Sequence, residues 1–339
     1  MEVVAGWVHK AFPIDDASRV GEARRFAAQA AAAMGWAELE AGRLALVVTE
    51  LGTNLLRHAQ KGRLLIASRP EACEVEVVCI DEGPGISDLA RSMQDGYSSG
   101  STPGTGLGAV RRLASDFDIH SAVPDGTVCV ARVRPAGAPR AVRADAQVDI
   151  GGLCLPAPGE IECGDAWSAA LEGDRIAVLM ADGLGHGPDA ARASREAQAV
   201  FAREPFAELR TQLQQAHQAL QTTRGAAVCL ARLDIGTGTL QWSGAGNVIG
   251  RVLSGVFDKS ILTQHGTVGM QIRKPETSSM ALPDHALVIL HSDGIESRWT
   301  ADRLRPLLQR DPTLVAAILL RDHTRHRDDA TIVVIRRKE

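Results

Sequence analysis

Aromatic side chains are scarce in this sequence, and long apolar runs are missing from it. Phe, Trp and Tyr make up 4% of its 339 residues, so a core must be built mainly from small aliphatic side chains. No run approaches the roughly 18 apolar residues that a membrane-spanning helix needs. The first residues also lack the basic region and apolar segment that mark a secretory signal. The sequence therefore predicts a cytoplasmic protein without a membrane partner.

An excess of positive charge and a metal-binding cysteine pattern are missing as well. Lys and Arg number 37 against 41 Asp and Glu, a formal charge of −4, which disfavours a nucleic-acid partner. The basic clusters at 132–143 and 321–327 are interpreted as solvated faces. The cysteines show no metal-type spacing, and most lie in apolar strand-like runs, which predicts buried reduced thiols. They occupy positions 73, 79, 129, 154, 163 and 229.

The second half of the chain contains an apolar run of strand length that ends in an acid. Residues 176–181 are apolar, and Asp182-Gly183-Leu184-Gly185 follows them as a Gly-rich turn. A carboxylate at the end of a buried strand is held by rigid backbone, as a metal ligand should be. A single Asp-Gly pair is mostly a turn signal, so the interpretation depends on its companions.

Three further acids lie at the edges of apolar runs in the same half. Asp165 precedes the run, Asp293 follows the run 287–290, and Asp328 precedes the run 332–335. Carboxylates brought together repel one another unless cations compensate their charge. Oxygen ligands favour hard ions such as Mg²⁺ or Mn²⁺. The pattern therefore predicts a two-metal hydrolase.

The order of these motifs resembles the metal-dependent serine/threonine protein phosphatases, in their SpoIIE/RsbX branch. The resemblance covers about residues 145–339. It implies that the metal ligands are Asp165, Asp182, Asp293, Asp328 and the carbonyl of Gly183, with Asp182 and Asp293 at the centre of catalysis. One departure concerns the general acid. Better-known members place a histidine where this chain has Leu184, and His186 lies two residues later.

The first half carries a different set of motifs. Glu50 and Asn54 lie four residues apart within a predicted helix, so they share one ridge of it. A strand-like run over 73–80 ends in Asp81 and leads into the tight turn Glu82-Gly83-Pro84-Gly85. A Gly-rich loop over 96–108 then opens a further helix, where backbone N–H groups and the helix dipole favour phosphate.

This order resembles the GHKL ATP-binding fold, and within it the RsbT/RsbW-type serine kinases, over about residues 10–135. The resemblance implies ATP as the cofactor, with Mg²⁺ on its phosphates bound by Asn54 and the adenine amino group bound by Asp81. Glu50 becomes the general base for a substrate hydroxyl, since phosphoryl transfer needs a carboxylate to accept that proton. The remaining implied nucleotide contacts are Gly83, Gly85, Gly104, Gly106, Gly108 and Thr127.

The predicted architecture is α/β with two domains. A GHKL α/β sandwich over 1–136, with a mixed sheet and helices on one face, is followed by a linker over 137–146 and an α+β phosphatase-type β-sandwich over 147–339. Helices are expected at 17–34, 37–59, 188–203, 206–222, 300–309 and 312–322. A single strand is expected within 4–14, and the stretch 255–281 is irregular, with no role assigned.

Four side chains near the acids could take part in function, but a structural role is predicted for each of them. Trp167 is predicted to pack, and His291 is predicted to be a hydrogen-bonded core residue because it lies inside an apolar run. His323 and His326 flank Asp328 and are interpreted as solvated surface residues.

The two resemblances together predict a bifunctional switch protein. An ATP-dependent serine kinase would be fused to a Mn²⁺/Mg²⁺-dependent phosphoserine phosphatase. The implied partner is a STAS-domain phosphoprotein in a partner-switching circuit that controls a sigma factor or a stress response. In the alternative, the first half senses ATP or sequesters a partner, and the phosphatase is the sole catalyst. The sequence does not indicate the oligomeric state.

Overall fold

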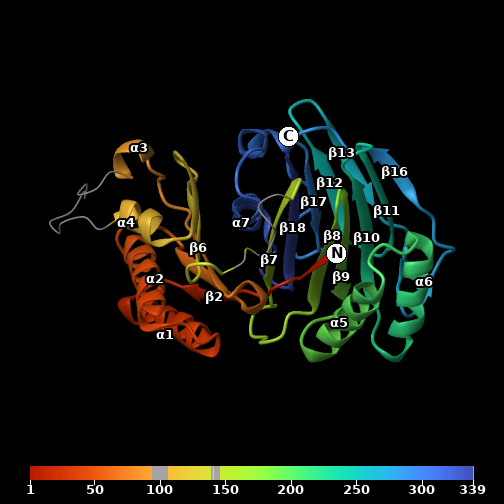
Figure 1. Cartoon of the computed structure of the whole chain (residues 1–339), viewed down its shortest axis with the longest axis horizontal. Coiled ribbons are helices and arrows are strands. Elements are labelled where there is room, and N and C mark those ends of the chain that lie inside the picture. Colours follow the sequence, from red (N-terminus) through yellow and green to blue (C-terminus); the bar gives the residue numbers. More distant parts are fainter. Residues whose placement is uncertain (94–105, 139, 141–145, 339) are drawn as a thin grey trace. The chain divides into compact units, whose positions relative to one another are not determined.

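The computed structural model describes residues 1–93, 106–138, 140 and 146–338. The chain divides into two units, whose elements are labelled in Figure 1. The smaller unit is His9–Arg143, and the larger unit combines Met1–Val8 with Ala144–Glu339. The fold is therefore discontinuous, because the larger unit takes its first strand from the start of the chain.

That first strand corrects the predicted boundary. The sequence predicts residues 1–8 as part of the first domain, with one strand within 4–14, whereas the structure has two strands there. β1 (Glu2–Ala5) pairs antiparallel with β8 of the larger unit, and β2 (Lys10–Pro13) lies in the smaller unit. The Gly6 N–H donates to the Trp167 carbonyl at 2.8 Å, and a Cβ on Gly6 would meet that oxygen at 2.3 Å. The close backbone approach therefore requires glycine at position 6.

The smaller unit is a five-stranded sheet with helices on one face. The strand order is β2-β3-β4-β6-β5, and every pairing is antiparallel, whereas the sequence predicts a mixed sheet. Short connections explain the difference, since only a few residues join β3 to β4 and β5 to β6. The elements after β2 are α1 (Ala17–Ala33), α2 (Glu38–His58), β3 (Arg63–Arg69), a 3₁₀ turn (Pro70–Ala72), β4 (Glu74–Ile80), α3 (Leu89–Ser92), α4 (Gly106–Leu113), β5 (Asp116–Ala122) and β6 (Gly126–Val133).

An apolar stripe along α2 forms part of the core of the smaller unit. Its side chains lie in one buried cluster with Val75, Val77 and Cys79 of β4. The stripe consists of Leu44, Val47, Val48, Leu51 and Leu55. The packing fixes which side of α2 is free, and it leaves Glu50 and Asn54 beside the stripe rather than within it. The position of α2 thus determines where its polar ridge points.

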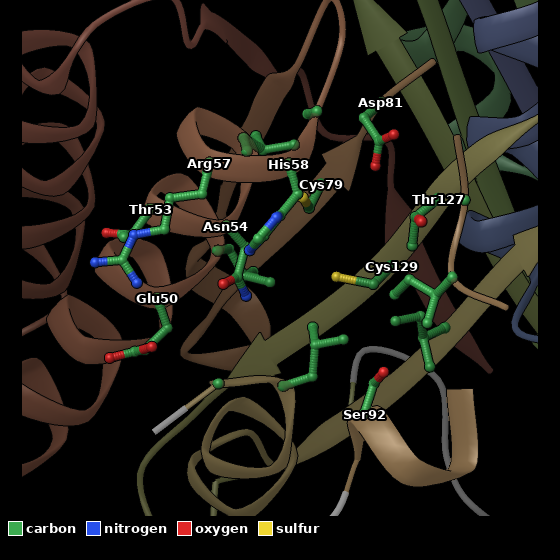
Figure 2. A pocket seen from close by; sticks show the side chains of 18 of the residues that line it. Glu50, Thr53, Asn54, Arg57, His58, Cys79, Asp81, Ser92, Thr127 and Cys129 are labelled. Atoms are coloured by element: carbon green, nitrogen blue, oxygen red, sulfur yellow. The ribbon is translucent and has the colours of Figure 1, made fainter. Parts of the chain in front are cut away.

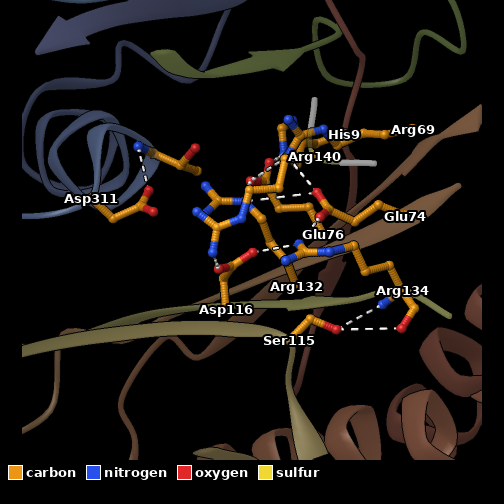
Figure 3. Close-up of polar contacts among 11 residues, drawn as sticks. His9, Arg69, Glu74, Glu76, Ser115, Asp116, Arg132, Arg134, Arg140 and Asp311 are labelled. Atoms are coloured by element: carbon orange, nitrogen blue, oxygen red, sulfur yellow. Dashed lines mark hydrogen bonds and ion pairs between the residues drawn. The ribbon is translucent and has the colours of Figure 1, made fainter. Parts of the chain in front are cut away.

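Charged side chains fill part of the other face of this sheet (Figure 3). Glu76 is fully buried and accepts hydrogen bonds from Arg132 Nε at 2.7 Å and from Arg69 Nη1 at 3.4 Å. Burial raises the pKa of Glu76, but Arg132 and Arg69 outweigh it and hold the pKa well below its usual range. The prediction of a solvated face over 132–143 is therefore wrong at its start, because Arg132 and Arg134 pair with acids on neighbouring strands.

The second basic cluster, over 321–327, also departs from the prediction at its first residue. Arg321 is buried, and its Nε donates to Asp322 Oδ1 at 2.7 Å. His323 is half-buried, whereas Arg325 and His326 are exposed. The prediction of a solvated face therefore holds for the end of this cluster and not for its start.

The larger unit contains two antiparallel sheets and a small hairpin. The first sheet, in spatial order, is β1, β8 (Asp165–Glu172), β9 (Arg175–Gly183), β10 (Ala226–Asp234), β11 (Thr239–Ala245) and β16 (Ser278–Ala281). The second is β13 (Asp258–Leu262), β12 (Ile249–Leu253), β17 (Leu287–His291), β18 (Ala330–Arg337) and β7 (Val148–Leu155). The hairpin is β14 (Gly266–Thr267) with β15 (Gln271–Ile272).

The two sheets face each other and helices cover their outer sides (Figure 1). Trp167 of β8 is fully buried, and a Cβ on Gly152 of β7 would lie 3.4 Å from its ring, so this indole fills the space between the sheets. α5 (Pro188–Arg203) and α6 (Leu209–Ala219) pack on the first sheet, and α7 (Pro312–His323) packs on the second. The predicted β-sandwich flanked by helices is confirmed.

The structure differs from two of the predicted helices, those at 300–309 and 206–222. The segment 300–309 forms two 3₁₀ turns, Ala301–Arg303 and Arg305–Leu307, because Pro306 lacks the N–H that a continuous helix needs. The 3₁₀ turn Leu220–Thr222 likewise replaces the end of the helix predicted to 222. Among the described helices, none is long and apolar enough to cross a membrane.

Candidate functional sites

The smaller unit holds a cavity of about 850 Å³ between α2 and the sheet. Glu50 and Asn54 line it from α2, Asp81 lines it from the end of β4, and Thr127 lines it from β6. Figure 2 shows Asp81 and Thr127 on one side of the cavity and Glu50 on the other, with Asn54 between them. The structure therefore brings these four sequence-predicted residues to one cavity, which has the volume of a nucleotide-sized site.

The turn after β4 shapes one end of this cavity. The Gly83 N–H donates to Asp81 Oδ1 at 2.7 Å, and a Cβ on Gly83 would meet that oxygen at 2.8 Å. Gly85 has φ +75°, and a Cβ there would lie 2.4 Å from the Ala122 carbonyl oxygen. Both glycines are thus required by close approach, and Gly85 also lines the cavity.

The Gly-rich loop is described only from Gly106 onward. Gly106 begins α4 and lines the cavity, and Gly108 is buried within α4. Gly104 lies outside the described residues, so its predicted phosphate contact stays a prediction. Thr127 is held by a 2.8 Å hydrogen bond between its hydroxyl and that of Ser121.

Two cysteines that the sequence predicts as buried reduced thiols are buried and free, and sequence reasoning missed that they line this cavity. Cys79 of β4 and Cys129 of β6 are directly opposite each other in the ladder, and both line the cavity. The hydrogen bond to Cys129 and burial together raise the pKa of Cys79 well above its ordinary value. The alternation of β4 contains the signal, because Cys79 falls on the same face as Val75 and Val77, toward the helices.

In the larger unit, the acids at the strand ends meet in one region. Asp165 of β8 and Asp182 of β9 are paired directly in the ladder. Asp182, Asp293 and Asp328 line a second cavity of about 380 Å³. The four predicted ligands thus converge from β8, β9, the end of β17 and the segment before β18. The predicted roles of these acids and of the Gly183 carbonyl remain predictions.

The acids repel one another, and some of their oxygens have no partner. Burial raises the pKa of Asp182 well above its ordinary value, and the charges of Asp165, Asp293 and Asp328 raise it further. Burial likewise raises the pKa of Asp165. Within the described part of the chain, one buried oxygen each of Asp165, Asp182 and Asp329 lacks a hydrogen-bond partner. Orphaned carboxylate oxygens in a group of like charges fit divalent cations.

The carboxylates do not surround a defined ion position. Among the residues that the structure describes, no three acidic, histidine or cysteine side chains form a group that could hold a metal ion as they stand. The chemistry of the donor set fits the ions.

Three residues around this cavity escaped the sequence analysis. Asp329 is 3% exposed, and its Oδ1 accepts a hydrogen bond from the Ala157 N–H at 2.8 Å. Asn247 Nδ2 donates to Asp293 Oδ2 at 2.7 Å and thereby orients that carboxylate. His265 lines the cavity from the segment before β14. Asp329 is the one that the sequence signals, since two adjacent acids before a strand point to opposite sides.

Comparison with known proteins identifies both halves. Residues 12–133 match the family model of the histidine kinase-like ATPase domain, and residues 172–338 match that of stage II sporulation protein E, SpoIIE. The serine/threonine-protein kinase RsbT of Bacillus subtilis (strain 168) is 30% identical over 107 residues, which cover 31% of this chain and 80% of RsbT. The chain therefore belongs to the RsbT family. The smaller unit is its RsbT-like ATPase domain, and the larger unit, which contains the segment that matches the SpoIIE model, is called the SpoIIE domain.

Solved structures agree with this identification. A chain from work on the bacterial stressosome, a modular system adapted to control secondary messenger signalling, is 28% identical, with a TM-score of 0.53 over 56% of this chain and all of the other. RsbX, in a crystal structure with magnesium, is 19% identical, with a TM-score of 0.51 over 57% of this chain and 98% of RsbX. At that identity RsbX shows the fold alone.

The SpoIIE domain extends beyond the segment that matches its family model. The match begins at residue 172, after Asp165, and yet β8 places Asp165 directly beside Asp182.

The predictions for two residues near the acids, Trp167 and His291, are confirmed. Trp167 is fully buried against Trp7, with ring centroids 4.8 Å apart, and His291 is buried with its Nδ1 hydrogen-bonded to the Ser292 carbonyl.

Proposed function

We propose that the SpoIIE domain is a phosphoserine phosphatase that depends on Mg²⁺ or Mn²⁺. The observation that supports it most is the convergence of acids at one cavity, where Asp182 pairs with Asp165 and both carry an unpartnered buried oxygen. Asp165, Asp182, Asp293, Asp328 and the Gly183 carbonyl would hold the ions. When bound, the ions would neutralise the phosphate and lower the pKa of a water that attacks phosphorus.

The protein's own residues would prepare this site. Asn247 fixes the direction of the Asp293 carboxylate through its 2.7 Å hydrogen bond. Asp329 anchors the loop at Ala157. A cavity of about 380 Å³ accommodates a phosphoryl group on a serine side chain.

We further propose that the ATPase domain is a protein serine kinase. Asn54 would bind the Mg²⁺ of the nucleotide, Asp81 would accept a hydrogen bond from the adenine, and Glu50 would accept the proton of the substrate hydroxyl. The location of all three side chains at one cavity supports this assignment. The kinase named among the relatives, RsbT, supports the reaction class.

The two activities would act on a STAS-domain phosphoprotein in a partner-switching circuit. Opposed reactions on one partner give a switch whose state follows the ratio of the two rates. The likeness to RsbT and to a stressosome component supports this class of partner and an output such as a sigma-factor regulator. The six cysteines, all free thiols, are consistent with a reducing cytoplasm as the place of action.

A second function uses the same cavity without phosphoryl transfer. The ATPase domain would sense ATP, or sequester a partner, and thereby regulate the phosphatase. The observation in its favour is that the cavity of about 850 Å³ is lined by the other predicted nucleotide contacts, Asn54, Asp81 and Gly85, besides Glu50.

A crossed pair of variants tests both proposals. The full chain, Glu50→Ala and Asp182→Asn are incubated with γ-labelled ATP and a STAS-domain protein, and separately with the phosphorylated STAS-domain protein and Mn²⁺. We expect Glu50→Ala to lose label transfer and keep phosphate release, and Asp182→Asn to do the reverse. ATP binding without transfer in the unaltered chain would instead support the sensor. Phosphate release that persists in excess EDTA would contradict the metal-dependent mechanism.

A further inference from the structure

The proposed phosphatase reaction needs a proton that the metal ligands do not supply. When the P–O bond to serine breaks, its electron pair stays on the serine oxygen, and a serine alkoxide is too basic to leave unprotonated. Carboxylates that hold cations are deprotonated and cannot donate. A further side chain at the cavity that carries a proton can act as the acid.

His265 is the imidazole at the cavity. Among the described residues, it is the one histidine that lines the space shared by Asp182, Asp293 and Asp328. Its side chain is exposed, and no hydrogen bond or ion pair of its ring is found in the described part of the chain. The exposed ring can therefore meet a substrate in the cavity.

The backbone on both sides of His265 is fixed to the first sheet. The Gln264 N–H donates to the Gly244 carbonyl at 3.0 Å, and the Gln264 carbonyl accepts from the Gly246 N–H at 2.9 Å. Three residues after His265, the Val268 N–H and carbonyl both pair with Ala226, at 2.8 and 3.0 Å. His265 is therefore carried by a short bridge between two anchored residues and not by a loose loop.

The residues that anchor this segment are next in sequence to residues that contact two of the acids. Ala226, to which Val268 is bound, is the neighbour of Ala227, and Ala227 pairs with Asp182 in the ladder. On the other side, Gly246 is the neighbour of Asn247, which binds Asp293. His265 is thus tied through one anchor to the strand of Asp182 and through the other to the partner of Asp293.

His186, the histidine nearest to Asp182 in sequence, is differently placed. His186 follows the Asp182 turn, but its Nδ1 lies 2.7 Å from Glu160 Oε1, and it is not among the residues that line the cavity. Leu184, at the position where better-known relatives have a histidine, lines the cavity and cannot donate a proton. The turn that supplies the predicted metal ligand Asp182 therefore contributes no histidine to the cavity lining.

We propose that His265 is the general acid of the phosphatase reaction, a role that rests on the proposed function of the SpoIIE domain. The attacking water releases one proton to solvent, its oxygen bonds to phosphorus, and the bond from phosphorus to the serine oxygen breaks. The serine oxygen keeps the electron pair and takes the proton of the protonated His265 ring. Serine and inorganic phosphate leave, and the ring recovers a proton from solvent.

The choice of leaving group tests this role. The full chain with Mn²⁺ is assayed on a phosphoserine peptide and on para-nitrophenyl phosphate, whose leaving group departs as a stable anion without a proton. We expect His265→Ala to lower kcat/KM by about 100-fold on the peptide and by no more than about threefold on the aryl phosphate. Added imidazole should restore part of the peptide activity, because the exposed position leaves room for it.

Two control variants make the result specific. Met270→Ala changes an exposed side chain in the same segment, just beyond the anchor at Val268, that does not line the cavity, and both activities should be unchanged. His186→Ala should affect the two substrates equally if at all. A loss confined to the peptide in His186→Ala, or equal losses on both substrates in His265→Ala, would overturn the assignment of His265.

Failure of the inference and failure of the proposed function give different results. An unaltered chain that hydrolyses neither substrate with Mn²⁺ overturns the phosphatase, and the role of His265 with it. An active unaltered chain whose His265→Ala variant keeps full activity on the phosphoserine peptide overturns the general acid alone.

Discussion

The backbone conformation of Gly85 should affect the affinity of the proposed nucleotide site. Its φ is +75°, and a Cβ at this position would lie 2.4 Å from the Ala122 carbonyl oxygen, which leaves no place for a side chain. Gly85→Ala should therefore shift the turn that lines the cavity and weaken ATP binding by at least about tenfold, the equivalent of about 1.4 kcal/mol. Calorimetric titration with a non-hydrolysable ATP analogue measures this change.

Gly42 supplies the matched control for that substitution. It is an exposed glycine inside α2, and a Cβ there meets nothing within 4 Å. Gly42→Ala should stabilise the protein by about 0.5–1 kcal/mol and leave ATP affinity unchanged. Equal affinities of the Gly85→Ala variant and the unaltered chain would show that the turn does not shape the nucleotide site.

Single residues also show where prediction from sequence succeeds and where it stops. Asp182 and Asp293 follow apolar runs into Gly-containing turns, and that local pattern is sufficient to find them. Asn247 and His265 have no such pattern, because they reach the cavity through bridges to strands distant in sequence. Asp329 lies between the two cases, since the sequence shows an acidic pair but not which member is buried.

At the scale of elements, runs that are apolar throughout are predicted well. β9 and β17 are buried along nearly their whole length, and β10 and β11 form a hairpin with Asp234 opposite Thr239. β1 could not be assigned to its unit, because four residues specify no partner and its partner β8 lies about half the chain length further on. Contacts between distant segments are a property of the folded chain that local patterns do not encode.

The packing of Trp7 tests whether the β1 segment is part of the SpoIIE domain. Trp7 is 7% exposed and packs edge-on against Trp167. Trp7→Ala should destabilise the SpoIIE domain by about 3 kcal/mol, through lost burial and the cavity left behind. Val8→Ala, at a side chain that is 47% exposed, should change stability by less than about 0.5 kcal/mol. Denaturant unfolding followed by phosphatase activity compares the two, and equal stabilities would place β1 outside the functional domain.

At the scale of the whole molecule, each candidate site is built from residues of a single unit. The nucleotide cavity is lined by residues between Glu50 and Cys129, all within His9–Arg143, and the carboxylates all lie in the SpoIIE domain. A ligand that binds only the folded form stabilises the unit that holds its site. The two ligands of the proposed switch should therefore act on separate parts of the chain.

Hydrogen exchange with each ligand in turn tests this separation. Mn²⁺ should slow amide exchange at the ends of β9 and β17, and an ATP analogue with Mg²⁺ should slow it in α2 and at the end of β4. Asp182→Asn should abolish the Mn²⁺ effect while it preserves the ATP effect, because Asp182 belongs to one site and not the other. Protection by Mn²⁺ that survives in Asp182→Asn would mean that the ion binds elsewhere, and the four aspartates would then lose their proposed role.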